Sequence, residues 1–208
     1  MKSIIAFGDS ITFGRFDHSA GGRVGRLKKY FEDQDSYHAV YNQGVPGDTS
    51  RGLLQRIDVE CKARAKYVWE GDKHIILIAI GINDSRGIDA PENVDVPLTD
   101  YEKNVQEILS IARKHSTIIV VIGITPVDED ITNPFENTYF TNEKIEEYNE
   151  MLKTICKNQQ IPFVDVYSEM KSKEYNTLLA DGVHPNYKGY DLLYKIIRKK
   201  LIIKKAIK

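Results

Sequence analysis

Cysteine is scarce in this 208-residue sequence, which has only two, Cys61 and Cys156. Each lies in a stretch whose apolar residues have helical spacing, and neither has the spacing to other ligand residues that metal-binding motifs require. Two isolated cysteines also exclude the disulfide framework of small secreted proteins. We therefore expect buried free thiols in a reducing compartment, with one disulfide as the lesser alternative.

Long hydrophobic runs and an excess of one charge are also missing. The first apolar stretch, Ser3–Phe7, follows Lys2 and is too short for a signal-peptide core, and no stretch has the length of a membrane span. The 29 Lys and Arg residues balance 30 Asp and Glu residues, which does not favour nucleic-acid binding. We expect one soluble cytoplasmic domain, residues 1–208, without stable membrane insertion and with no indication of oligomeric state.

Short β-branched runs alternate with helical patterns along the chain. The run Ile75–Ile80 and the first part of Ile118–Ile124 are apolar throughout, which is typical of central strands covered on both faces. Three more strands are expected at 4–7, 39–41 and 163–166. Strands and helices in alternation predict βαβ units with a parallel sheet.

Sequence signals also predict where some helices begin and where loops lie. Thr99 and Glu102 have the spacing of a capping box, and Thr141 is expected to cap a later helix. Two segments, Ser85–Leu98 and Pro126–Phe140, are predicted to be long loops that form the walls of a substrate site. The basic stretch 195–208 is expected to be a terminal helix packed on the sheet, rather than a membrane contact.

Four polar motifs follow this skeleton. Gly8–Ser10, Asn42–Gly47 and Gly81–Asp84 each come directly after a predicted strand, and Asp181–Asn186 precedes the last helix. The carboxyl ends of parallel strands meet at one edge of a sheet, where open α/β folds bind ligands. We therefore expect these four motifs to converge on one site.

The residue types in these motifs fit acyl transfer. A serine hydroxyl needs a base to take its proton, and the base needs a carboxylate that fixes its tautomer. We assign Ser10 as the nucleophile, His184 as the base and Asp181 as the orienting acid. The oxyanion of the tetrahedral intermediate also needs donors, for which the candidates are the backbone N–H groups of Ser10 and Gly44 and the side-chain amide of Asn83.

Asp9 and Asp84 are expected to hold the turns of these motifs by hydrogen bonds. Each catalytic assignment has a structural alternative: Ser10 as a helix cap, the motif glycines as turn residues, Asn83 and Asp84 as an Asx turn, and His184 as the start of the last helix.

The four motifs together resemble those of the SGNH (GDSL-like) hydrolases. Phe7–Thr12 resembles the block with the nucleophile, Asn42–Gly47 the block with an oxyanion glycine, Gly81–Asp84 the block with an oxyanion asparagine, and Asp181–Asn186 the block with the acid and base. The blocks occur in the family's order and span nearly the whole chain. The resemblance implies a flavodoxin-like α/β/α sandwich with a five-stranded parallel sheet, and ester hydrolysis without a cofactor.

The function expected is therefore that of a serine ester hydrolase acting on a small-molecule ester, with short acyl groups favoured over lipid acyl chains. A metal-dependent phosphoesterase is a second hypothesis, because Asp9, Asn83, Asp84 and His184 are ligand types. No D-x-H or H-x-x-H pairing accompanies these residues, and we assign no metal ligands. A non-catalytic binding module on the same fold is the third hypothesis.

Overall fold

The main sheet has five strands, all parallel, in the order β2-β1-β3-β5-β7. The computed structural model describes residues 2–66 and 70–203. Counted within the sheet, this strand order is the flavodoxin-like 2-1-3-4-5, which confirms the predicted fold class. The strands are β1 (Lys2–Gly8), β2 (Ala39–Gly44), β3 (Lys73–Ala79), β5 (Ile118–Ile122) and β7 (Phe163–Val164).

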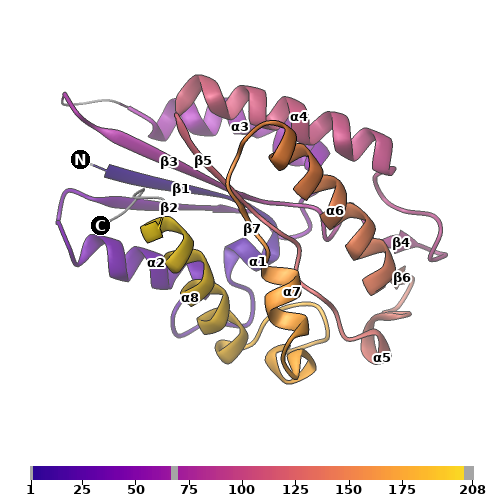
Figure 1. Ribbon diagram of the computed structural model, residues 1–208. Coiled ribbons are helices and arrows are strands. Elements are labelled where there is room, and N and C mark those ends of the chain that lie inside the picture. The colour runs from indigo at the N-terminus through magenta and orange to yellow at the C-terminus, as the bar shows by residue number, and fades with distance from the viewer. Residues whose placement is uncertain (1, 67–69, 204–208) are drawn as a thin grey trace.

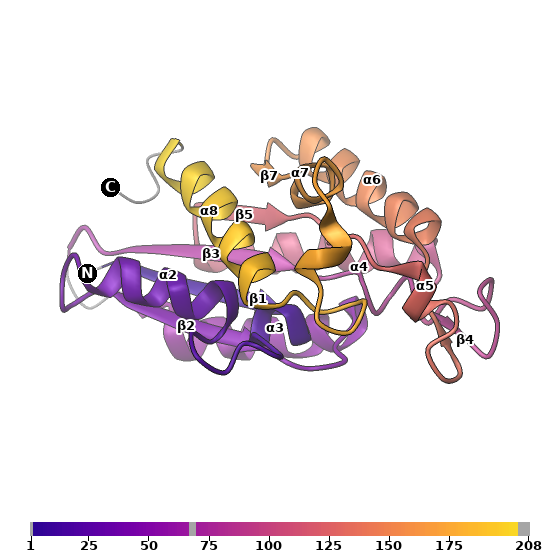
Figure 2. The ribbon, with the colours of Figure 1, turned by 90° about the horizontal axis from the view of Figure 1, so that it is seen from below.

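Helices cover both faces of this sheet. Figure 1 shows α3, α4 and α6 over one face and α2 and α8 over the other, and Figure 2 views the molecule from the side of α2 and α8. The predicted three-layer arrangement is therefore confirmed. The long helices are α2 (Gly22–Glu32), α3 (Ser50–Arg64), α4 (Leu98–His115), α6 (Asn142–Asn158) and α8 (Tyr187–Ile203), and the short ones are α1 (Ser10–Phe13), α7 (Val166–Lys171) and the 3-10 helix η1 (Tyr175–Leu178).

Apolar residues on both faces of β3 explain its central place. The side chains of residues 75–78 are at most 1% exposed, because helices pack against the two faces that successive residues point to. The flanking helices present stripes with helical spacing. On α4, Tyr101, Val105, Ile108 and Ala112 are all buried. The buried residues of the strands and helices form one core, which fixes the position of the sheet and of the turns at its edge.

The expected helix starts are right in one case and wrong in the other. Thr141 is the N-cap of α6, and its side chain accepts a hydrogen bond from the Lys144 N–H. The capping box predicted at Thr99 and Glu102 is wrong, because α4 already begins at Leu98. Pro97 precedes the helix in an extended conformation, and its carbonyl accepts the first hydrogen bonds, so Thr99 lies within the first turn.

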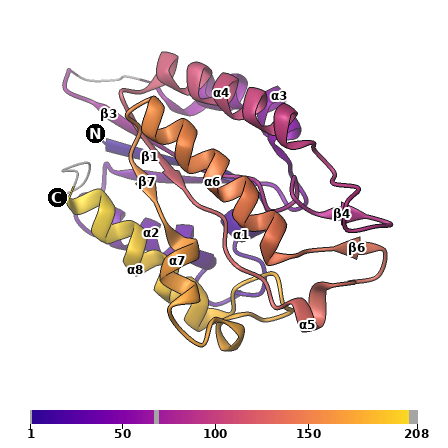
Figure 3. The same cartoon turned by 45° about the vertical axis from the view of Figure 1, so that its right-hand side comes forward.

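The two segments expected to be loops contain short elements. Segment 85–98 carries β4 (Gly87–Ile88), and segment 126–140 carries α5 (Glu129–Thr132) and β6 (Thr138–Tyr139). β4 and β6 pair antiparallel. Figure 3 shows this small sheet and α5 together at one end of the molecule. Strands of two residues carry no detectable period, which is why the pattern of the sequence did not indicate them.

The last helix packs as expected. Leu193, Ile197 and Leu201 of α8 are fully buried, while residues 204–208 of the predicted terminal helix lie outside the described residues. Within 2–66 and 70–203, no helix has both the length and the apolar character needed to cross a membrane.

Both cysteines are free and buried, as predicted. Burial raises the pKa of each thiol to about 12, with nearby Asp58 and Glu60 adding to the effect at Cys61. The thiolate is the reactive form, so almost none is present at neutral pH.

We expect a thiol reagent such as DTNB to leave Cys61 and Cys156 unmodified in the folded protein and to titrate both in a denaturant. The reason is that burial blocks access and suppresses the thiolate. Absorbance of the released thiol measures the reaction. Rapid reaction of either thiol without denaturant would contradict this account.

Candidate active site

The turns after β1, β2 and β3 meet at the carboxyl edge of the sheet, as the topology requires. The turn after β2 is tied to β1, because the Val45 N–H donates to the Gly8 carbonyl at 2.9 Å. The segment 181–184 reaches the same edge from the other end of the chain.

Ser10, His184 and Asp181 form one chain of hydrogen bonds. His184 Nε2 lies 2.8 Å from Ser10 Oγ, and His184 Nδ1 lies 2.8 Å from Asp181 Oδ2. A carboxylate only accepts, so Nδ1 carries the proton and Nε2 can accept one from the hydroxyl. The other oxygen, Asp181 Oδ1, accepts the His184 backbone N–H at 2.7 Å, which fixes the short turn between these two residues.

Asp181 is held in its charged form. Burial raises the pKa of this carboxyl, but hydrogen bonds from the His184 side chain and backbone and from the Val183 N–H outweigh burial and bring it below the ordinary value. An ionised carboxylate at this position can stabilise a positive charge on the His184 ring.

Asp9, and not Ser10, caps the helix that begins after β1. Asp9 Oδ1 accepts the Ile11 N–H at 2.9 Å, and Ser10 is the first residue of α1. The alternative interpretation of Ser10 as a helix cap is therefore wrong. Burial raises the pKa of Asp9, with the Arg23 charge opposing it. The cap leaves the Ser10 hydroxyl free to face His184.

Gly44 is not among the residues that line the cavity beside Ser10 and His184. It ends β2, and its N–H donates to Asn42 Oδ1 at 3.0 Å. Gly47, three residues later, lines the same cavity as Ser10 and Asn83. Its φ is +79°, a conformation that favours glycine, and a Cβ there would meet no atom within 4 Å. The predicted strand at 39–41 placed both glycines beyond its end, whereas β2 extends to Gly44, so the sequence held no signal that separated them.

Asn83 lines the cavity, and the next residue, Asp84, is buried. Asn83 Nδ2 donates to the Asp48 carbonyl at 2.9 Å, which uses one of its two amide hydrogens. Asp84 is fully buried and accepts the Ser50 N–H at the start of α3 through both oxygens. Burial raises the pKa of Asp84 to about 7, despite the hydrogen bonds from Ser50 that oppose it.

A cavity of about 460 Å³ opens beside Ser10 and His184. Arg86 from segment 85–98 and four residues of segment 126–140 line this cavity. Both segments therefore form part of its wall, as the sequence analysis predicted. The Phe16 ring meets His184 edge-on with centroids 5.5 Å apart. The lining residues are Ser10, Arg15, Phe16, Pro46, Gly47, Asn83, Arg86, Phe135, Glu136, Thr138, Phe140, Asp181, Val183 and His184.

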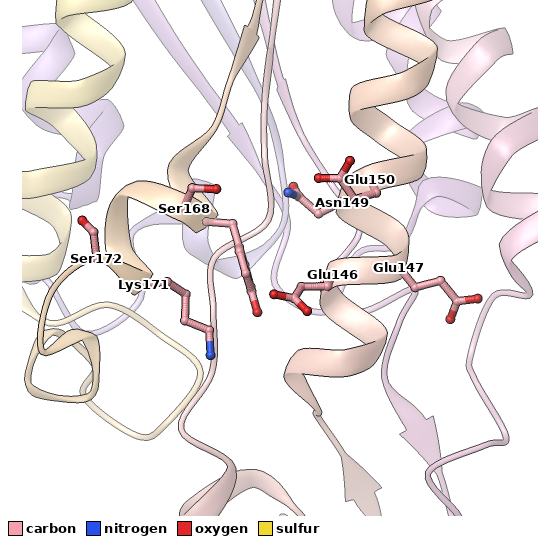
Figure 4. Close-up of a pocket in the computed structure, with 8 residues that line it drawn as sticks. Glu146, Glu147, Asn149, Glu150, Ser168, Lys171 and Ser172 are labelled. Carbon is pink, nitrogen blue, oxygen red and sulfur yellow. The ribbon is translucent and has the colours of Figure 1, made fainter.

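A second, larger cavity of about 690 Å³ lies between α6 and α7 and contains none of the motif residues. Figure 4 shows Glu146 of α6 extending toward α7, while Glu147 points the other way. Neither a histidine nor a cysteine is among the residues that line this cavity. The remaining residues around it are Asn149, Glu150, Tyr167, Ser168, Lys171 and Ser172.

Carboxylate side chains line both cavities, but among the described residues they form no metal-binding cluster. In the parts of the chain that the structure describes, no three His, Cys, Asp or Glu side chains lie close enough to hold one ion. Asp9, Asp84 and His184, the ligand types of the phosphoesterase hypothesis, are engaged by Ile11, Ser50 and Asp181.

The parallel sheet and the polar groups at its carboxyl edge are those of an α/β hydrolytic enzyme. The chain belongs to the GDSL-like Lipase/Acylhydrolase family, whose model matches residues 6–192. This membership makes it a carboxylic ester hydrolase, and it confirms the family resemblance of the four motifs.

Three relatives illustrate the similarity. The chain is 24% identical to an isoamyl acetate-hydrolyzing esterase of Saccharomyces cerevisiae, over 95% of this chain and 85% of that protein. A lipase/acylhydrolase from Enterococcus faecalis superposes with a TM-score of 0.77 at 24% identity, covering 97% and 95% of the two chains. An acetylxylan esterase from Geobacillus stearothermophilus gives 0.73 at 21% identity, covering 96% and 93%. The two solved structures establish the fold.

Asp84 generates a pH dependence of stability. The pKa of Asp84 in the folded protein, about 7, lies above its ordinary value of 3.8. The contribution of Asp84 to the free energy of unfolding is therefore complete below about pH 4 and is lost as pH rises through 7. The amide introduced by an Asp84→Asn substitution cannot titrate. We therefore expect the free energy of unfolding of the variant, relative to wild type, to increase by about 1.4 kcal/mol per pH unit across this window.

Urea unfolding at about pH 5 and pH 7 measures the difference. Asp100→Asn, at the half-exposed start of α4, serves as the matched control for the substitution of a carboxylate by an amide. An Asp84→Asn variant with the same relative stability at both pH values would contradict the raised pKa.

Proposed function

We propose that this protein hydrolyses carboxylic esters with Ser10 as nucleophile, His184 as general base and Asp181 as the acid that orients the base. The observation that carries the proposal is the unbroken chain of hydrogen bonds, each 2.8 Å, from Asp181 through His184 to Ser10. Its open end, Ser10 Oγ, faces a cavity that admits a small substrate.

In the first half of the reaction, Ser10 Oγ attacks the ester carbonyl while His184 Nε2 takes its proton. His184 then returns this proton to the leaving alkoxide, and an acyl-enzyme forms. In the second half, a water molecule takes the place of the alcohol and the same base activates it. The products are a carboxylic acid and free Ser10.

The negative charge of each tetrahedral intermediate needs donors. We propose the backbone N–H groups of Ser10 and Gly47 and the amide of Asn83, in place of the set with Gly44 expected from the sequence. In support, Ser10, Gly47 and Asn83 share the cavity wall, whereas the Gly44 N–H is engaged by Asn42. Donors already in place cost no reorganisation during the reaction.

Short acyl esters are the proposed substrates. The yeast relative is named for an acetate ester and the Geobacillus neighbour for acetylxylan. A cavity lined by Arg15, Arg86 and Glu136 as well as by aromatic rings suits a polar alcohol part better than a long apolar chain.

The single-domain organisation over 1–208 and the cytoplasmic location stay predictions.

Replacing Ser10 tests the nucleophile. We expect Ser10→Ala to lower kcat for p-nitrophenyl acetate by about 10⁶, or to the detection limit, because nothing else at the site can form the acyl-enzyme. Steady-state assays of p-nitrophenol release give kcat. Ser172→Ala, which removes a hydroxyl bonded to the Glu169 carbonyl on α7, is the control and should keep full activity. Near-normal turnover by Ser10→Ala would end the proposal.

Replacing Asn83 tests the oxyanion donor. We expect Asn83→Ala to lower kcat by about 10²–10³ with a much smaller change in KM, because the lost hydrogen bond strengthens only as charge develops. Asn93→Ala, which removes an amide that donates to the Ile88 carbonyl in an exposed hydrogen bond, is the matched control. An unchanged kcat in Asn83→Ala would remove Asn83 from this role.

A further inference from the structure

Arg56 is a charged side chain that belongs to none of the four motifs and does not line the catalytic cavity. It projects from α3, and both its Nε and its Nη2 donate to Asp48 Oδ2, at 2.9 and 2.7 Å. Nη2 also donates to the Gly8 carbonyl at 3.1 Å. The Arg56 side chain is 19% exposed and that of Asp48 is 8% exposed, so the pair is shielded from solvent.

These contacts join three turns of the site. Gly8 ends β1 two residues before Ser10. The hydrogen bond from Arg56 to the Gly8 carbonyl therefore holds the strand end that carries the proposed nucleophile. Asp48 directly follows Gly47 in the turn after β2. The Asp48 carbonyl accepts the Asn83 amide at 2.9 Å, which links the turn after β3 to the same residue. One guanidinium therefore holds, directly or through Asp48, the segments that carry all three proposed oxyanion donors.

The local sequence is built around this pair. Asp48, Gly52 and Arg56 are spaced by four residues, so they follow one face of α3 and the turn before it. A Cβ at Gly52 would overlap Asp48 Oδ1, so a larger residue there would displace the carboxylate from its present position. Asp48 Oδ1 in turn accepts the Thr49 N–H at 3.1 Å, which fixes the carboxylate from its other side.

We propose that Arg56 is a positioning residue that keeps the oxyanion donors of Ser10, Gly47 and Asn83 in register with one another. This inference rests on the proposed function of the site. Arg56 acts through Asp48 and Gly8 and does not touch the substrate. Small displacements of catalytic groups are costly, since an error of about 1 Å can reduce a rate by 10².

Two variants of Arg56 test the proposal. We expect Arg56→Ala and Arg56→Lys to lower kcat for p-nitrophenyl acetate by about ten- to a hundredfold with KM within about twofold. Lysine keeps the charge and the packing of the chain but lacks the planar fork that reaches both acceptors, which keeps the test valid where alanine prevents folding. Arg64→Lys, an arginine on the same helix paired with Glu60, is the control and should keep wild-type kcat.

A double-mutant cycle separates positioning from a general structural role. If Arg56 acts on the oxyanion donors, the fold-loss caused by Arg56→Lys should be smaller by more than about threefold in the Asn83→Ala background than in wild type. Equal fold-losses in both backgrounds, or wild-type kcat in both Arg56 variants, would overturn the proposal. Absence of esterase activity in the wild-type protein would instead overturn the proposed function, so the two failures are distinguishable.

Discussion

The hydrogen bond between Ser10 Oγ and His184 Nε2 joins two residues that are 174 positions apart in the chain. Nothing local brings them together. Their meeting depends on the parallel sheet, which aligns the ends of β1, β2 and β3, and on the core that packs α8 behind segment 181–184. Because β1, β2 and β3 end at the same edge, the three motifs that follow them lie together, and the segment before α8 adds the fourth. A shift in the register of β1, β2 and β3 would move the ends of these strands apart and separate the motifs.

Much of this arrangement could be predicted from the sequence because the relevant signals are strong and local. Apolar runs such as Ile75–Ile80 indicated central strands, and the motif after each strand had to lie at its carboxyl end. The spacing of Asp181 and His184 was enough to place a carboxylate beside the ring, as the 2.8 Å contact shows. The parallel direction of the strands and their order in the chain thus determine which motifs lie at the same edge of the sheet.

Other features depend on contacts that no local pattern records. Gly44 and Gly47 look alike in the sequence, and only the end of β2 shows which of them faces the cavity. Thr99 had the spacing of a cap, yet the extended Pro97 started α4 earlier. The role proposed for Arg56 depends on two acceptors, Asp48 and Gly8, that are far from each other in sequence. Three-dimensional contacts decide each of these cases.

Mass spectrometry of the protein after reaction with a fluorophosphonate identifies an activated serine, because this probe bonds covalently to a serine that a neighbouring base has activated. We predict one adduct per chain, on the peptide that contains Ser10, and none after His184→Ala or after denaturation. An unmodified wild-type protein, or an adduct on a serine other than Ser10, would contradict it.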